Sequence, residues 1–138
     1  LGPATNHIGN ESKVPVFYET MEHMPAAARR YTLPRMGQLY PMKTLAFFCV
    51  MMPRAVYEKV GPMDESFGRG FFEDDDYSRR IEQQGLRLAC ADDVLVHHHL
   101  SASFDKVDNG ERQALFERNK AYYESKWGPW IPHRYRTP

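Results

Sequence analysis

The sequence has few cysteines, no long apolar segment and no excess of charge of either sign. Its two cysteines, Cys49 and Cys90, both lie in apolar, strand-like stretches, so we expect buried free thiols in a reducing compartment rather than a disulfide. The longest apolar run, residues 45–52, is far shorter than the roughly 20 residues that cross a bilayer. Eighteen basic and eighteen acidic residues cancel, which argues against nucleic acid as a partner.

Apolar residues are nevertheless abundant enough for one globular domain with its own core. Hydrophobic side chains make up 42% of the 138 residues, and aromatic ones 13%. The pattern predicts an α/β fold in which helices flank a short mixed sheet. We expect strands at 45–52, 86–91 and 94–98, and helices at 21–36, 55–60, 73–84 and 110–126. Residues 1–16 and 101–109 should be loops, and residues 128–138 an extended tail.

Local signals mark the ends of several of these elements. Thr20 is placed to cap the first helix, and Gly61 and Gly85 are placed to end the second and third. Asp92 and Asp93 should turn the chain between the last two strands. Apolar positions on the predicted elements give the expected core, namely Leu45, Phe47, Val50, Tyr57, Ile81, Leu88, Leu95, Phe116 and Tyr122.

The most distinctive segment is a run of four acids, Glu73 to Asp76, at the start of a predicted helix. Carboxylates this close repel one another, so cations, solvent or the positive end of the helix dipole must offset the repulsion. Asp75 and Asp76 each precede an arginine, Arg79 or Arg80, by one helical turn. For these two we therefore favour solvated helix-start acids paired with arginines.

Glu73 and Asp74 have no such local partner. They follow Gly68, Arg69 and Gly70, a segment able to form a flexible loop. A carboxylate exposed beside such a loop can accept a proton from a substrate hydroxyl. From the residues alone, this role and that of a plain helix-start acid remain equally open.

A histidine triplet, His97 to His99, ends the last predicted strand. Alternation along a strand puts His97 and His99 on one face and His98 on the other. Two imidazoles on one face are a partial metal site, although any single histidine is more simply a hydrogen-bonded core or interface residue. The sequence lacks the cysteine and histidine patterns of zinc sites. Mixed carboxylate and imidazole ligands favour Mn²⁺ or Mg²⁺ holding phosphates.

Several of these segments, taken in order, resemble the C-terminal half of the catalytic domain of a family 2 glycosyltransferase, the inverting type with a GT-A fold. Residues 2–11 are similar to the Gly-Pro-x-Ser/Thr-Asn segment of that family and the Gly-Asn-Glu that follows it. Residues 72–76 match its x-Glu-Asp motif with a trailing aspartate. The other similar segments are residues 45–62, 63–67, 97–104 and 118–128.

The resemblance implies a role for each candidate residue. Asp74 would be the catalytic base that deprotonates the acceptor hydroxyl, and Glu73 would hold the acceptor. His97, with His99 on its face, would join an Mn²⁺ or Mg²⁺ ion that neutralises the leaving diphosphate. The acceptor side would be lined by Asn6, Asn10, Glu11, Gly68, Arg69 and Gly70.

The same resemblance implies an enzyme that transfers a sugar from a nucleotide-diphosphate sugar to a glycan acceptor, in bacterial polysaccharide synthesis. The Asp-x-Asp motif and the nucleotide-binding strands of the family are absent upstream of residue 73. We therefore expect an acceptor half, inactive alone, whose exposed sheet edge could promote self-association. We expect a cytoplasmic protein, membrane-associated only through parts outside this chain. Residues 1–42 would form an acceptor-side loop and helix, 43–104 the sheet core, and 105–138 the last helix and tail.

Two other functions remain open. The chain, or the protein that contains it, could bind a sugar or a partner through the same cleft without catalysis. The acids and histidines could alternatively serve a metal-dependent hydrolase.

Overall fold

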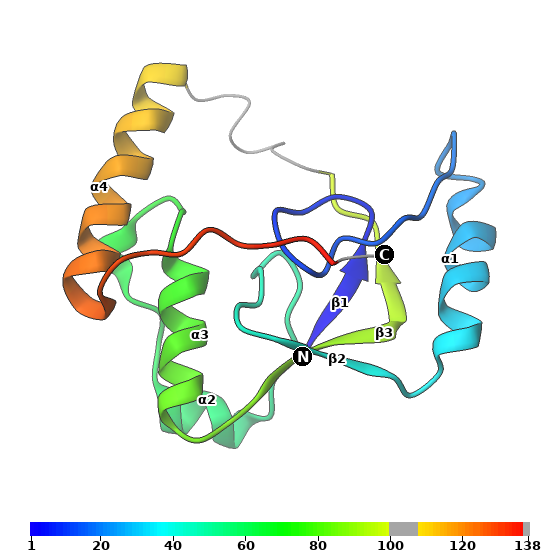
Figure 1. Ribbon diagram of the computed structural model, residues 1–138, viewed down its shortest axis with the longest axis horizontal. Helices are drawn as coiled ribbons and strands as arrows, with labels where there is room; N and C mark the ends of the chain where they lie inside the picture. Colours follow the sequence, from blue (N-terminus) through cyan, green and yellow to red (C-terminus); the bar gives the residue numbers. More distant parts are fainter. Residues whose placement is uncertain (100–107, 137–138) are drawn as a thin grey trace.

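The computed structural model describes residues 1–99 and 108–136 and has an α/β fold, in which helices flank a small three-stranded mixed sheet (Figure 1). The strand order is β1-β3-β2, with β1 at Gly2–Thr5, β2 at Leu39–Met42 and β3 at Leu88–Val96. β1 pairs with β3 in parallel, with a register shift between Pro3 and Ala4, and β2 pairs with β3 in antiparallel. The predicted class, a short mixed sheet with flanking helices, is confirmed.

The four predicted helices are all present. They are α1 at Met24–Thr32, α2 at Arg54–Val60, α3 at Glu73–Gln83 and α4 at Asn109–Trp127. Short 3₁₀ turns follow α1 at Leu33–Arg35 and precede α3 at Glu65–Phe67. Gly61 and Gly85 have φ angles of 85° and 74°, a conformation that glycine adopts without strain at a helix end.

The start of α1 differs from the prediction. Its N-terminal flanking residue is His23, which makes no side-chain cap hydrogen bond, so the predicted cap at Thr20 is wrong. Pro25 lies in the first turn of α1, where the missing N–H of proline would have had no partner in the helix. Pro34 then falls in the 3₁₀ turn that follows.

The predicted strands need four corrections. β2, at Leu39–Met42, was not predicted as a strand. Residues 45–52 are not a strand but an irregular segment. β3 includes Asp92 and Asp93 as one strand, with a register shift against β1 at this point. A distant partner holds each carboxylate: Arg136 lies 2.7 Å from Asp92, and the Gly37 N–H lies 2.9 Å from Asp93. The predicted loop at residues 1–16 contains β1, whose four residues are all buried.

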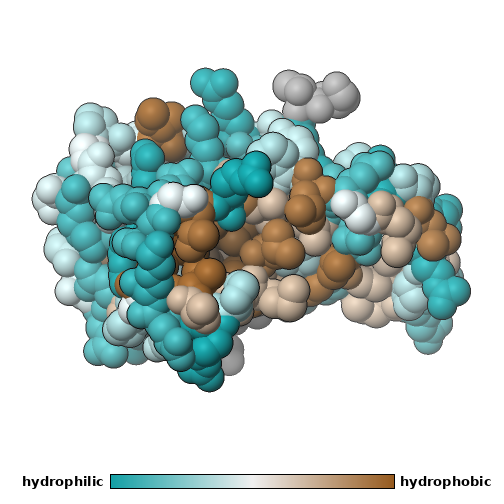
Figure 2. Space-filling model, turned by 90° about the horizontal axis from the view of Figure 1, so that it is seen from below, coloured by the Kyte–Doolittle hydropathy of each residue, from teal (hydrophilic) through white to brown (hydrophobic). Residues whose placement is uncertain are grey.

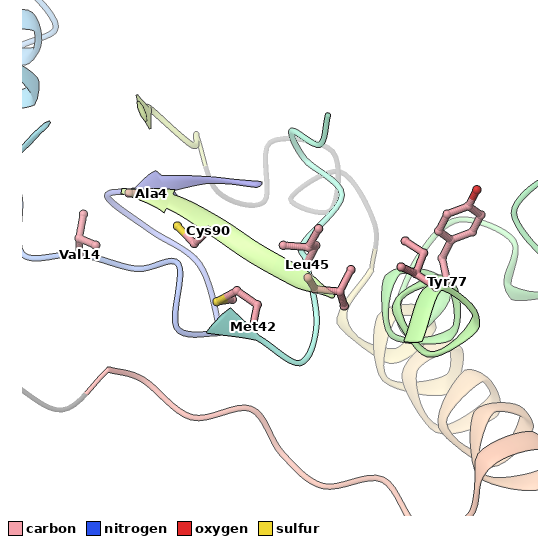
Figure 3. Close-up of a cluster of buried hydrophobic side chains, with 8 residues drawn as sticks. Ala4, Val14, Met42, Leu45, Tyr77 and Cys90 are labelled. Atoms are coloured by element: carbon pink, nitrogen blue, oxygen red, sulfur yellow. The ribbon is translucent and has the colours of Figure 1, made fainter. Parts of the chain in front are cut away.

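The main core extends from the sheet to α3, and Figure 3 shows that separate segments contribute its side chains. Leu45, Ile81 and Leu88 are buried as predicted, but Tyr57 is 42% exposed and does not belong to the core. Phe47, Val50 and Leu95 are partly buried against this cluster. Its buried members are Ala4, Val14, Met42, Leu45, Tyr77, Ile81, Leu88 and Cys90.

A second, aromatic cluster joins α3, α4 and the segment after α4. Its buried members are Phe67, Phe72 and Tyr123. The predicted core residues Phe116 and Tyr122 are partly buried here rather than in the main core. The chain thus has two packing centres, and the start of α3 belongs to the second of them.

The surface bears on three further predictions. Both cysteines are free, but only Cys90 is buried, so the prediction for Cys49 is wrong. β1 is an edge strand, and on its outer side the Thr5 carbonyl accepts a hydrogen bond from the Val14 N–H. Apolar side chains gather near the middle of the face in Figure 2, between more hydrophilic flanks. Among the described residues, no helix is long and apolar enough to cross a membrane.

Part of the predicted histidine motif, at residues 100–104, lies outside the described residues, as do most of the predicted loop at 101–109 and the last two residues of the tail.

Candidate active site

The acid run begins directly after two residues with unusual backbone geometry. Phe71 and Phe72 have φ angles of 66° and 71°, a left-handed conformation that costs roughly 1–2 kcal/mol per residue for a side chain other than glycine. Asn119 is fully buried and donates hydrogen bonds of 2.6 Å to the Gly70 carbonyl and 3.2 Å to the Phe71 carbonyl. Packing around Phe72 adds to this restraint. The surrounding structure therefore imposes a strained turn at the start of α3, as is common at functional sites.

This turn places three of the acids, Glu73, Asp74 and Asp75, at the wall of a cavity of about 600 Å³. Seven of the nineteen lining residues are aromatic, and the lining comes from segments far apart in the sequence. Its aromatic members are Phe47, Phe48, Phe71, Phe72, Phe116, Trp130 and Tyr135. An apolar pocket with a few convergent polar groups is the usual form of a small-molecule site.

Among the acids that line this cavity, Asp74 has the most strongly shifted pKa. Burial, and then the neighbouring carboxylates of Asp75 and Glu73, raise its pKa from 3.8 to about 7. Burial, and then Asp75, also raises the pKa of Glu73. A carboxyl group with a pKa near neutrality can take up a proton and release it again at physiological pH.

Asp75 and Asp76 do not form the solvated pairs that the sequence favoured, because both are buried. Asp75 accepts a hydrogen bond of 3.1 Å from the Thr44 hydroxyl. It also lies 3.1 Å from His133 Nε2. The predicted partner of Asp75, Arg79, instead faces Glu82 at the surface.

Asp76 faces away from the cavity lining and into a network of donors. Trp127 Nε1–H donates to it at 2.9 Å, and the ammonium group of Lys126 contacts the same carboxylate oxygen. The predicted pair with Arg80 is present at 3.7 Å. Asp76 thus ties α3 to the end of α4 and has a structural role.

The histidine triplet is divided between two cavities. His98 lines the same cavity as Asp74 and stacks on Phe48, with 4.4 Å between ring centroids. His97 instead lines a second cavity of about 780 Å³, where its Nδ1 contacts the Tyr18 hydroxyl. The rings of His97 and His99 lie 6.2 Å apart. It is thus His98 rather than His97 that shares a cavity with the predicted base.

The predicted metal ligands His97 and His99 were compared with the other possible ligands in the described part of the chain. Within residues 1–99 and 108–136, no group of three or more histidine, cysteine, aspartate or glutamate side chains lies close enough together to hold a metal ion. The predicted Mn²⁺ or Mg²⁺ ion stays a prediction, and we assign no chemical step to a metal.

The residues predicted to line the acceptor side are only partly brought together. Asn10 lines the cavity of Asp74, and Asn6 lines the second cavity, where its Oδ1 accepts the His98 backbone N–H at 2.8 Å. Glu11 lines neither cavity, and its backbone carbonyl accepts a hydrogen bond from Arg136.

The glycine-bearing loop also lies away from both cavities. Gly68, Arg69 and Gly70 line neither one. Gly70 is buried, and Gly68 and Arg69 are exposed. The carbonyl of Gly70 is held by Asn119. This loop shapes the entry to α3 rather than the cavity wall.

Sequence analysis missed the contribution of the tail after α4. Trp130, His133 and Tyr135 all line the cavity of Asp74. The available signal was the pair of prolines, Pro129 and Pro132, with Trp130 and Tyr135 close to them, which favours an extended segment with side chains that can pack.

The comparisons with known proteins give one distant match. No model of a known protein family matches this chain, and no solved structure matches it. The chain is similar to the uncharacterized protein y4gI of Sinorhizobium fredii (strain NBRC 101917 / NGR234), with 28% identity over 93 residues. That match covers 67% of this chain but only about 10% of the relative's length.

Proposed function

We propose that this chain is the acceptor-binding part of an inverting glycosyltransferase with a GT-A fold, of the family 2 type, and that Asp74 is its catalytic base. The observation that carries the proposal is the position of Asp74, a carboxyl group with a raised pKa, beside Glu73 in a cavity rich in aromatic side chains. The order of the motifs in the sequence supports the same conclusion.

In this mechanism the cavity binds a sugar acceptor with one hydroxyl directed at Asp74. The hydroxyl oxygen attacks the anomeric carbon of a nucleotide-diphosphate sugar, and the new C–O bond forms as the bond to the diphosphate breaks. The hydroxyl proton passes to Asp74, and the bonding electrons of the broken bond leave with the diphosphate. Attack from the face opposite the leaving group inverts the anomeric configuration.

The aromatic lining suits this acceptor class. A sugar ring has an apolar C–H face that packs on aromatic side chains, and hydroxyl groups at its edge that need hydrogen-bond partners. The polar part of the lining includes Asn10, Glu73, His98, Arg112 and His133. Exclusion of water by the aromatic side chains also keeps the proton affinity of Asp74 high.

The test is sugar transfer by the full-length gene product that contains this chain, with a panel of labelled nucleotide sugars and glycan acceptors. Asp74→Asn should reduce turnover by about 10²–10⁴-fold, the usual contribution of a general base. Nucleotide-sugar binding should be unchanged.

Glu82→Gln is the matched control, because Glu82 lies on the same helix at the surface. It should transfer sugar as the wild type does. Retained turnover in Asp74→Asn would remove Asp74 from the role of base. Glycan binding without transfer of any sugar would instead identify a non-catalytic sugar-binding module.

A further inference from the structure

The segment that follows α4, residues 128–136, forms a strap across one side of the molecule. It leaves α4 at Gly128, passes the start of α3 and reaches the sheet (Figure 1, red). Near its beginning, the backbone N–H of Trp130 donates to Glu124 at 3.0 Å. In its middle, His133 Nε2 lies 3.1 Å from Asp75. Residues of the strap therefore form one wall of the cavity that contains Asp74.

The far end of the strap is held by Arg136. Its guanidinium makes two hydrogen bonds, of 2.8 Å and 2.7 Å, to the two carboxylate oxygens of Asp92. The same group stacks over the ring of Tyr40, with 4.0 Å from Cζ to the ring centroid. Paired bonds between arginine and a carboxylate are strong and directional. The strap is thus fixed at both ends, with its aromatic residues between the two anchors.

Two lining residues of this cavity each leave a buried polar atom without a partner. Among the described residues, Trp130 Nε1–H and Glu73 Oε2 are buried and make no hydrogen bond. The ring of Trp130 packs edge-on against Phe72, with 5.2 Å between centroids. Buried donors and acceptors without partners are rare and destabilising. Asp76 Oδ2 is a third such atom, but it lies outside the cavity lining, whereas a ligand in the cavity could supply the partner of the other two.

The two orphaned atoms have complementary chemistry. The indole N–H can only donate a hydrogen bond, and an ionised Glu73 can only accept one. Hydroxyl groups do both, so a ligand with several hydroxyls satisfies each of them. Arg112 and His133 line the same cavity as Glu73 and Asp74, so charge alone does not select the ligand. A neutral ring with an apolar face suits the aromatic side chains of the lining.

We propose that the strap is the acceptor-recognition element, in which Trp130 Nε1–H and Glu73 hydrogen-bond the hydroxyls of a neutral sugar ring. This inference rests on the proposed function and adds the ligand class and a recognition residue outside the x-Glu-Asp motif. Trp130 touches the acceptor and takes no part in the transfer of the proton.

The experiment follows the indole N–H signal of Trp130 by NMR while methyl glycosides of glucose, galactose and N-acetylglucosamine are added to the chain. The sequence has two tryptophans, so Trp127→Phe assigns the indole N–H signal that remains to Trp130. The Trp130 signal should shift on saturation with at least one glycoside. The Trp127 N–H, bonded to Asp76, should not shift.

Trp130→Phe retains an aromatic ring and removes the N–H donor. It should weaken binding of that glycoside at least tenfold, whereas Trp127→Phe should bind it as the wild type does. Equal affinity in Trp130→Phe, or a Trp130 signal that stays unmoved while other cavity residues shift, would overturn the strap inference alone. Absence of any glycoside binding to the wild type would overturn it as well. Binding without sugar transfer by the full-length protein would count against the proposed function only.

Discussion

Asp74 and Asp76 lie two residues apart on the first turn of α3, yet their surroundings differ in kind. Asp74 lines an aromatic cavity, where burial and two neighbouring carboxylates raise its pKa to about 7. Asp76 is fully buried on the other side, with Lys126 and Trp127 Nε1–H at its carboxylate. The difference teaches that the role of an acid at a helix start depends on what the rest of the fold places against it. A carboxylate that has a cation partner is structural, whereas one held among other carboxylates keeps its capacity for proton transfer.

The strongest test of this comparison is the loss of the Asp76 network. Asp76→Asn removes one of the two carboxylates at Lys126, while Asp64 stays 2.8 Å away. Loss of hydrogen bonds to a buried charged group typically costs about 1–3 kcal/mol. The free energy of unfolding, measured by urea denaturation, should fall by about this amount. Asp74→Asn should leave it unchanged or raise it at neutral pH. Equal losses in the two variants would show that both acids are structural.

The pH dependence of stability provides the next test. The pKa of Asp74 in the folded chain, about 7, lies above its ordinary value of 3.8. Its contribution to stability is therefore fully present below about pH 4 and is lost as the pH rises through 7. Asp74→Asn removes this loss because asparagine stays neutral.

Stability curves of the wild type and Asp74→Asn, recorded between pH 4 and 8, should therefore diverge. As the pH rises, the free energy of unfolding of the variant should increase relative to that of the wild type, by at most about 4 kcal/mol. Parallel curves would mean that Asp74 titrates at an ordinary pKa in the folded chain.

A smaller effect is expected at His133, whose positive charge lowers the pKa of Asp74. His133→Gln removes that charge, so the pKa of Asp74 should rise further. The measurement is a ¹³C NMR titration of the aspartate carboxyl groups in the two proteins. A pKa that falls or stays constant would show that His133 is not charged beside Asp74.

The smallest effect is expected at Arg69, which sequence analysis had placed at the acceptor site. The structure leaves it exposed and outside both described cavities. Arg69→Ala should change the free energy of unfolding by no more than about 0.5 kcal/mol, as is usual for surface substitutions. Glycoside affinity should equal that of the wild type. A tenfold loss of affinity would return this loop to the site.

Sequence analysis succeeded for features that depend on neighbouring residues and failed for features that depend on residues far apart in the sequence. The helices were predicted well, because glycines such as Gly61 and Gly85 and the spacing of apolar residues act within a few positions. The strands were predicted poorly. β1 is only four residues long and pairs with β3, almost ninety positions away along the chain. The segment 45–52 has strand-like composition but finds no strand partner among the described residues.

In the candidate site, too, some residues could be predicted from the sequence and others could not. Glu73 and Asp74 stood out because four adjacent acids are unusual in any context, and both reach the cavity. Trp130 and His133 were missed, because only the path of the strap brings them to α3. Sequence analysis chose His97 rather than His98. Alternation along a strand shows that the two point to opposite faces, but it does not indicate which face meets the cavity of Asp74.

The sequence by itself determined the α/β class, the four helices and the position of the acid run at a helix start. Those features depend on local periodicity, on capping and on chain composition, all of which act over short separations. Only the tertiary structure decided which acid lies in a cavity and which is neutralised. Burial and the nearest charges set a pKa, and residues more than fifty positions apart supply both.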